Sequence, residues 1–306
     1  MKDIFSKLTY FLIIIMVLLG VINSPIALLL GFVYTLIFNN PFKEYSRIAI
    51  QYFLKISVIG LGFGMFIKET LATSKEGLSI TIYSIVLTVS LGLLLTRILK
   101  LDLKLGHLIT SGTAICGGSA IAAISPVIKA RGNTISLALG IVFLLNAIAL
   151  FVFPAVGYYL NLTQEQFGLW CAIAIHDTSS VVGAALGYGE EALRIATTVK
   201  LSRTLWIIPL SILSMFLFKT KGEKIKIPYF IILFMIAILI NSCHILPKPT
   251  TVLIVLLSKR LLVITLFLVG SNISISDLKS TGFKPILLAL ILWMFISSFS
   301  LLYIMS

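Results

Sequence analysis

Long apolar runs, separated by short polar links, follow one another along nearly the whole chain. A helix needs about 20 apolar residues to cross a bilayer. Because the links are short, the pattern predicts one all-α polytopic membrane domain over residues 1–306, with no room for a soluble catalytic domain. The chain has about nine to eleven predicted segments, at 8–22, 25–38, 47–67, 77–97, 107–128, 133–156, 167–188, 192–218, 227–246, 251–275 and 282–304.

Composition supports a membrane protein. Hydrophobic residues make up 59% of the chain and charged residues 11%, against about 25% charged in a soluble domain. We assign the net charge of +13 to Lys and Arg in cytoplasmic loops rather than to nucleic-acid binding. The widely spaced Cys116, Cys171 and Cys243 predict neither a disulfide framework nor a metal site. No catalytic motif stands out, so we predict neither an enzyme nor a cofactor.

The first residues combine a basic start with an apolar run, as a signal peptide does. Because no small-residue cleavage site follows the run, we interpret it as a retained first helix with a cytoplasmic N-terminus.

Charge in the loops makes two segments anomalous, 107–128 and 167–188. If 107–128 crosses the membrane fully, the basic Lys129 and Arg131 lie outside, against the positive-inside rule. If both segments are re-entrant hairpins, the basic pair stays inside and the acidic pair Glu190–Glu191 stays outside. The charge pattern therefore favours hairpins, sheltered by protein at membrane depth.

The same two segments resemble each other. Ala114–Ala123 matches Ala174–Gly183, and a second match pairs Gly62–Glu69 with Gly270–Asp277. In the hairpin topology an odd number of crossings separates each pair, so the repeats are inverted. Inverted repeats with discontinuous helices are typical of secondary transporters.

The first candidate site is Cys116-Gly117-Gly118-Ser119. Two glycines disfavour a continuous helix by about 1 kcal/mol each, and Ser119 is a good N-cap for a helix that restarts after them. The free N–H groups and positive dipole end of such a helix would bind an anion. The alternative is close helix packing through small residues.

The second candidate site is the run His176-Asp177-Thr178-Ser179-Ser180 inside an apolar stretch. An ionisable residue within a membrane segment is a functional-site hypothesis by default. We predict that His176 and Asp177 couple transport to H⁺ or Na⁺, and that Thr178, Ser179 and Ser180 cap the restarting helix and bind the substrate. The alternative is an exposed helix start at which Asp177 is only the N-cap.

Lys200 and Arg203 are spaced to share one helix face. We predict that both attract an anionic substrate. The alternative is snorkelling toward the headgroups, above all for Arg203. Asn146, in the middle of 133–156, could line the site or form an ordinary interhelical hydrogen bond, and we favour the second interpretation.

Several of these motifs resemble a known family. Cys116–Ala123 with Pro126–Ile128, and His176–Val182 followed by Val199–Arg203, are similar to the signature of the sulfate exporter family (YeiH-like bacterial inner-membrane proteins). That family is similar to the bile-acid/sodium symporters and cation/proton antiporters. The resemblance implies a core domain with the broken helices, a scaffold domain, and often a homodimer.

The chain departs from that pattern around Gly60, Gly62 and Gly64, where relatives tend to have Leu-Gly-x-Arg-Leu. If that arginine binds an anion in the relatives, this protein lacks an arginine for that role at the corresponding position.

These observations predict a secondary transporter in a bacterial inner membrane. It would move a small anion, such as sulfate or an organosulfonate, coupled to H⁺ or Na⁺. Its partners would be the solute, the coupling ion, the lipid bilayer and a second copy of the chain, with no nucleic acid. The alternatives are a cation/proton antiporter centred on Asp177 and a membrane scaffold or sensor that transports nothing.

Overall fold

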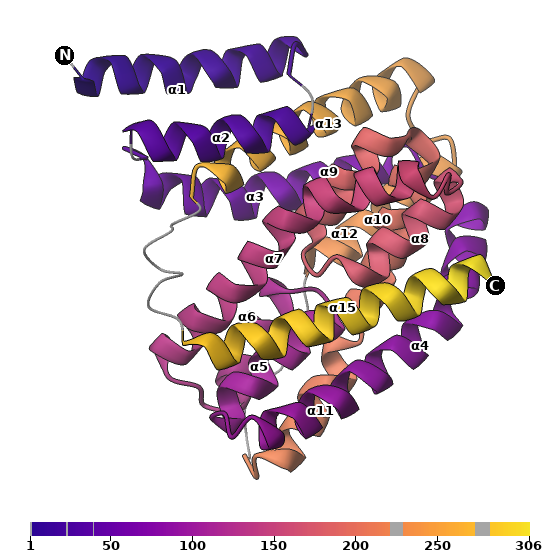
Figure 1. The fold of residues 1–306 in the computed structure, drawn as a ribbon. Coiled ribbons are helices and arrows are strands. Elements are labelled where there is room, and N and C mark those ends of the chain that lie inside the picture. Colours follow the sequence, from indigo (N-terminus) through magenta and orange to yellow (C-terminus); the bar gives the residue numbers. More distant parts are fainter. Residues whose placement is uncertain (1, 23, 39, 221–228, 273–281) are drawn as a thin grey trace. The chain divides into compact units, whose positions relative to one another are not determined.

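A computed structural model describes residues 2–22, 24–38, 40–220, 229–272 and 282–306 (Figure 1). Every regular element among them is an α-helix. In chain order the helices are α1 (Lys2–Leu19), α2 (Ser24–Phe38), α3 (Lys43–Gly62), α4 (Ile67–Ile98), α5 (Leu103–Ala114), α6 (Gly118–Val127), α7 (Gly132–Tyr159), α8 (Gln164–Ala174), α9 (Thr178–Tyr188), α10 (Glu190–Thr204), α11 (Ile207–Leu217), α12 (Tyr229–Ser242), α13 (Lys248–Gly270) and α15 (Phe283–Met305).

The predicted class, an all-α polytopic membrane protein, is confirmed. Within the described ranges, five helical segments are long and apolar enough to cross a membrane: Thr70–Ile98, Gly132–Tyr159, Glu190–Leu217, Lys248–Gly270 and Phe283–Met305. The two anomalous segments, 107–128 and 167–188, are each divided into two short helices, α5 with α6 and α8 with α9.

The chain forms two compact units. The first comprises residues 1–72 and 228–273, and the second comprises residues 73–227 and 274–306. All the predicted site residues belong to the second unit.

In the first unit, α13 packs against α2 and α3, and α12 packs against α3. Small residues allow these close approaches. A Cβ on Gly31 would lie 2.2 Å from the carbonyl oxygen of Phe267, so α2 and α13 meet almost backbone to backbone. Buried hydroxyls add cross-links, such as the 2.8 Å hydrogen bond between Tyr10 and Ser46.

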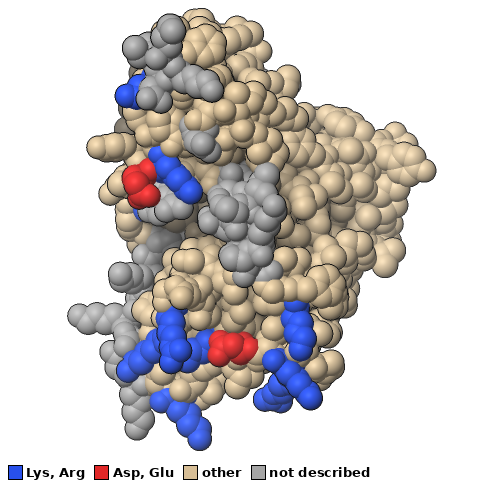
Figure 2. All heavy atoms as spheres, turned by 60° about the vertical axis from the view of Figure 1, so that its left-hand side comes forward, with Lys and Arg blue, Asp and Glu red and all other residues tan. Residues whose placement is uncertain are grey.

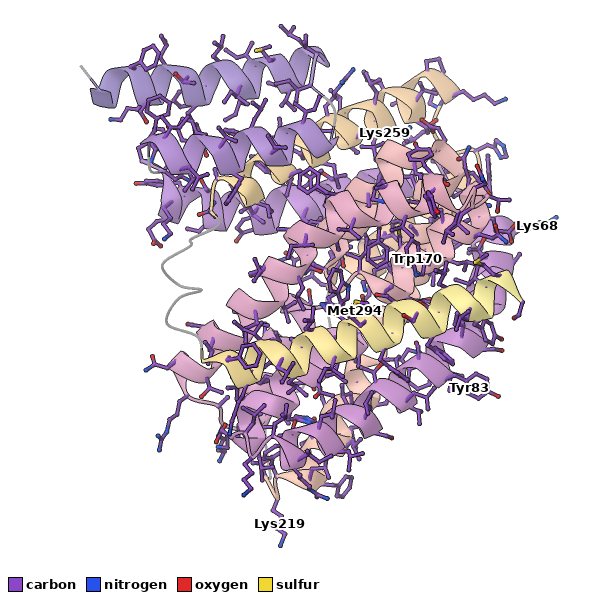
Figure 3. All side chains as sticks on the ribbon, in the orientation of Figure 1. Lys68, Tyr83, Trp170, Lys219, Lys259 and Met294 are labelled. Atoms are coloured by element: carbon purple, nitrogen blue, oxygen red, sulfur yellow. The ribbon has the colours of Figure 1, made fainter. Side chains whose placement is uncertain are left out.

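In the second unit, long helices enclose the short ones. α7 contacts α5, α6 and α9, α15 contacts α5, α7 and α8, and α10 contacts α8 and α9. Trp170 of α8, labelled in Figure 3, donates from its indole nitrogen to the Ser297 carbonyl of α15 at 3.0 Å. Residues 105–114 of α5 are all buried. This enclosure provides the shelter that non-helical backbone needs at membrane depth.

Candidate functional site at the tips of two helical hairpins

α5 and α6 form a re-entrant hairpin, as the loop charges predicted. The Lys104 ammonium, at the start of α5, donates to the carbonyl of Lys129, just beyond α6, at 2.8 Å. The chain therefore returns to the end of the unit at which it went in. At the tip, the Gly117 N–H donates to the Gly112 carbonyl at 2.8 Å and closes the turn.

α8 and α9 form a second hairpin. The Gln164 side-chain oxygen, at the start of α8, accepts a 3.0 Å hydrogen bond from the N–H of Glu191, just beyond α9. The Tyr188 hydroxyl donates to the Leu162 carbonyl at 2.7 Å. The rings of Phe167 and Tyr188 stack with centroids 3.7 Å apart. These contacts hold the two ends of the hairpin together.

The two hairpins go in from opposite ends of the unit, because α7 separates their bases. α7 begins just after the first hairpin and ends just before the second. Its 28 residues span about 42 Å at 1.5 Å per residue. This opposed arrangement agrees with the inverted repeat predicted from Ala114–Ala123 and Ala174–Gly183. The second predicted match, with Gly270–Asp277, lies largely outside the described residues.

The two hairpin tips meet at Gly117. Its φ is +59°, a conformation that favours glycine. A Cβ at this position would lie 3.3 Å from the backbone nitrogen of Asp177 and 3.3 Å from the carbonyl carbon of His176. The positive φ therefore favours glycine at this turn, and a Cβ here would make a tight contact with the second tip.

Lys200 and Arg203 of α10 hold the C-terminal ends of α8 and α5. The Lys200 ammonium donates to the carbonyls of Ile175 at 2.7 Å and Ala172 at 3.2 Å. The Arg203 guanidinium donates to the Ala114 carbonyl from Nε at 2.9 Å and from Nη2 at 2.5 Å. A cation at a helix C-terminus compensates the negative dipole end and the unpaired carbonyls.

Both of these cations are fully buried, with 0% of their surface exposed. The alternative interpretation, that Arg203 snorkels toward the headgroups, is therefore wrong. Because the two residues lie on one face of α10, a single helix holds both hairpin tips. Sequence reasoning placed the pair on one face but did not foresee that they bind helix ends.

Asp177 caps the N-terminus of α9. Its carboxylate accepts hydrogen bonds from the Ser179 N–H at 3.1 Å and from the Ser179 hydroxyl. The prediction that the hydroxyl residues cap this helix is corrected, because the carboxylate of Asp177 occupies that position. Thr178, Ser179 and Ser180 are buried, whereas Asp177 is partly exposed. The cap is thus part of an internal break in the helix rather than an exposed helix start.

Asn146 of α7 also belongs to this tip. Its side-chain oxygen accepts from the N–H groups of His176 at 3.1 Å and Asp177 at 3.2 Å. The interpretation of Asn146 as an interhelical hydrogen-bonding residue is confirmed, and its partners are the backbone N–H groups at the break between α8 and α9. The available signal was an amide in the middle of an otherwise apolar segment. The His176 ring, with 0% of its surface exposed, has no hydrogen-bond partner at either nitrogen within the described part of the chain.

The N-terminus of α6 differs from that of α9. The N-cap is Gly117, a residue that has no side chain with which to cap this end. Ser119 was predicted as the N-cap, and that prediction is wrong. The positive φ at Gly117 starts the helix at Gly118, so Ser119 lies in the first turn with its side chain exposed. Cys116 is buried and interacts with the Thr204 side chain and the Ala120 N–H.

The bases of the two hairpins carry opposite charge. Lys100, Lys104, Lys129 and Arg131 lie around the first base. Figure 2 shows Lys and Arg gathered along the lower edge of the face that it draws, and Figure 3 shows Lys219 pointing away from the helices at the end of α11. Around the second base lie acidic residues: Glu165, Glu190 and Glu191.

The fold and the site define a helical membrane protein with two opposed re-entrant hairpins whose tips meet in its interior. The chain belongs to the family described as Conserved hypothetical protein 698, whose profile matches residues 6–289.

The chain is similar to proteins named UPF0324 membrane protein. The one from Photobacterium profundum is 51% identical over 98% of this chain and 92% of its own length. The relative from Bacteroides thetaiotaomicron is 47% identical, covering 92% and 86%, and that from Porphyromonas gingivalis is 43% identical, covering 99% and 98%. No solved structure matches. These names state a membrane protein and no substrate.

Proposed function

We propose that the protein is a secondary transporter that moves a small anion, such as sulfate or an organosulfonate, across the bacterial inner membrane with H⁺ or Na⁺ as coupling ion. The observation that carries the proposal is the meeting of two opposed hairpin tips, one of which leads into a helix whose N-cap residue is a glycine. Helix N-termini at such breaks bind anionic groups of transported solutes.

The basic base of the first hairpin supports an orientation. By the positive-inside rule, that base and the N-terminus of the chain face the cytoplasm, and the acidic base of the second hairpin faces outside. A substrate at the tips is then separated from each side by one hairpin. Small movements of the second unit would open the site to one side at a time.

Asp177 is the proposed coupling residue. It is the one carboxylate that the described residues place at the tips, and it is partly exposed there. A proton or Na⁺ on this carboxylate would change both the local charge and the cap of α9. The same observation supports the second candidate function, a cation/proton antiporter. The homodimer that the family resemblance implies stays a prediction.

The experiment is an uptake screen in proteoliposomes with sulfate, sulfite, sulfonates and dicarboxylates, with and without pH and Na⁺ gradients. We expect gradient-driven accumulation of an anion that is lost in Asp177→Asn and kept in Glu165→Gln, which neutralises an exposed carboxylate at the second base. Exchange of Na⁺ for H⁺ without anion uptake would support the antiporter. If none of these solutes moves, the proposed anion transport is refuted and the scaffold or sensor becomes the alternative to test.

A further inference from the structure

Lys200 is a buried base for which the described residues provide no acidic partner. Its side chain is 0% exposed, and its Nζ donates to the carbonyl oxygens of Ile175 and Ala172. The charged and titratable groups near enough to interact with it lie on α10, on α8 and at the two tips: Arg203, Cys171, Cys116, His176 and Asp177. The one carboxylate among them, that of Asp177, caps α9, and no ion pair joins it to Lys200 within the described ranges.

The number of hydrogen-bond acceptors suits the uncharged form of this side chain. A neutral amine has two N–H groups, and the two carbonyls accept both. An ammonium has three N–H groups, so the third is left without an acceptor in the described part of the chain. The end of α8 offsets only about half a unit charge, and burying the rest without a partner is costly. The closed tip therefore holds the amine more readily than the ammonium.

Opening of the tip reverses that preference. If the end of α8 moves away from α10, Lys200 meets water, in which a lysine is protonated below about pH 10.4. The other basic groups at the tips do not change charge in this way near neutral pH. The Arg203 guanidinium keeps its proton throughout. The His176 imidazole, once exposed to water, takes up a proton only below about pH 6.5. Lys200 is therefore the basic group at the tips whose charge follows the opening.

We propose that Lys200 is a proton-exchanging residue, which is uncharged while the second hairpin tip is closed and protonated when that tip opens. On opening, the lone pair of Nζ takes a proton from water on the side to which the tip opens. On closing, the ammonium returns one proton to water, and the amine again donates to the carbonyls of Ile175 and Ala172. Opening and protonation are thus linked, with one proton for each movement of the tip.

An anion at the tips would change the closing step of this cycle. It supplies the negative charge that the ammonium lacks, so the loaded tip closes with Lys200 still protonated. The empty tip closes only after the proton has left. Anion and proton would then cross the membrane together, which makes the transport a symport with H⁺. This step rests on the proposed function, and it adds to Asp177 a second residue that binds the coupling proton.

The test measures how fast the buried Cys171 of α8 reacts with iodoacetamide as the pH changes, in the purified full chain without added substrate. Cys171 precedes Ala172, so its labelling reports release of the end of α8. Dividing by the rate of the exposed Cys243 removes the effect of pH on the thiolate. Lowering the pH favours the ammonium and hence the open tip. From about pH 9 to about pH 7 we expect the ratio to rise at least about tenfold, against a limit of about tenfold per pH unit for one proton.

Three variants make the test specific. Lys200→Gln has two N–H donors, as the neutral amine has, and takes up no proton, so the ratio should stay low at every pH. Lys200→Arg keeps its charge, so the ratio should stay high at every pH. Lys219→Gln removes an exposed lysine at the end of α11 (Figure 3) and should keep the wild-type profile. At the low end of the pH range, methanesulfonate should slow the labelling of Cys171 in the wild type and change nothing in Lys200→Gln.

A wild-type ratio that is constant over this range, or that falls as the pH is lowered, overturns the inference. So does a folded Lys200→Gln variant that keeps the wild-type pH dependence. If neither variant of Lys200 folds, the sign and size of the wild-type change decide. A protein that transports an anion but shows a constant ratio refutes the inference alone. A ratio that follows pH through Lys200, in a protein that neither binds nor transports any anion, supports the proton site and refutes the proposed anion transport.

Discussion

Replacing Arg203 with Met should loosen the first hairpin tip. The Ala114 carbonyl would lose both of its hydrogen bonds, and an unsatisfied buried carbonyl costs about 1–3 kcal/mol. The C-terminus of α5 would also lose its cation, worth up to about 2 kcal/mol when partly buried. Burying the uncharged Met side chain avoids the cost of desolvating the guanidinium, and this offsets the loss by roughly 1–2 kcal/mol. The net loss is about 2–3 kcal/mol of local stability.

Cys116 reports this loss directly, because its thiol is buried at the same tip. If the thiol reacts only when the tip opens, the reaction rate follows the open population. A loss of about 2–3 kcal/mol then corresponds to roughly 30- to 150-fold faster labelling by a maleimide. Cys243 is exposed and serves as the reference for complete labelling, read by mass spectrometry of both peptides.

The matched control is Arg194→Met on the same helix. Arg194 forms an i,i+3 pair with Glu191 near the surface, and such pairs contribute less than about 1 kcal/mol. The control should label Cys116 less than about fivefold faster than the wild type. Wild-type labelling in Arg203→Met, or equal acceleration in both variants, would refute the role of Arg203 in holding the tip.

Two further predictions concern the tip turn and the topology. Gly117→Ala should lower the unfolding free energy by about 1–3 kcal/mol, since φ is positive there. Gly140→Ala, with nothing within 4 Å of the added Cβ, should raise it by about 0.5–1 kcal/mol; equal shifts of the unfolding midpoint would contradict the turn geometry. For topology, in a background without native cysteines, an impermeant thiol reagent added outside intact cells should label Glu190→Cys but not Asn133→Cys. Outside labelling of position 133 would exclude the proposed orientation.

Much of the fold could be predicted because the signals for membrane insertion lie within each segment and its adjoining loops. Hydropathy and length located the helical segments, and the charges of Lys129 and Arg131 distinguished hairpins from full spans. These signals act over one segment and its loop, so they need no knowledge of distant contacts.

The details of the site could not be predicted in the same way. The bonds of Arg203 reach Ala114, 89 positions earlier in the chain, and no local pattern names that partner. We placed the N-cap at Ser119 rather than at Gly117 because propensity ranks serine above glycine. The turn at this tip has a positive φ, which favours glycine. The hydrogen bonds of Asn146 to His176 and Asp177 are likewise tertiary contacts, which no local pattern predicts.

Accessibility of Ser119 tests the central claim, that the hairpin tips form a site open to each side of the membrane in turn. The measurement uses Ser119→Cys in a background lacking Cys116, Cys171 and Cys243. An impermeant thiol reagent is applied to right-side-out and to inverted vesicles, with and without methanesulfonate. Alternating access predicts labelling from both sides, slowed by the anion in both. Labelling from one side only, at a rate that no transported anion changes, would contradict it.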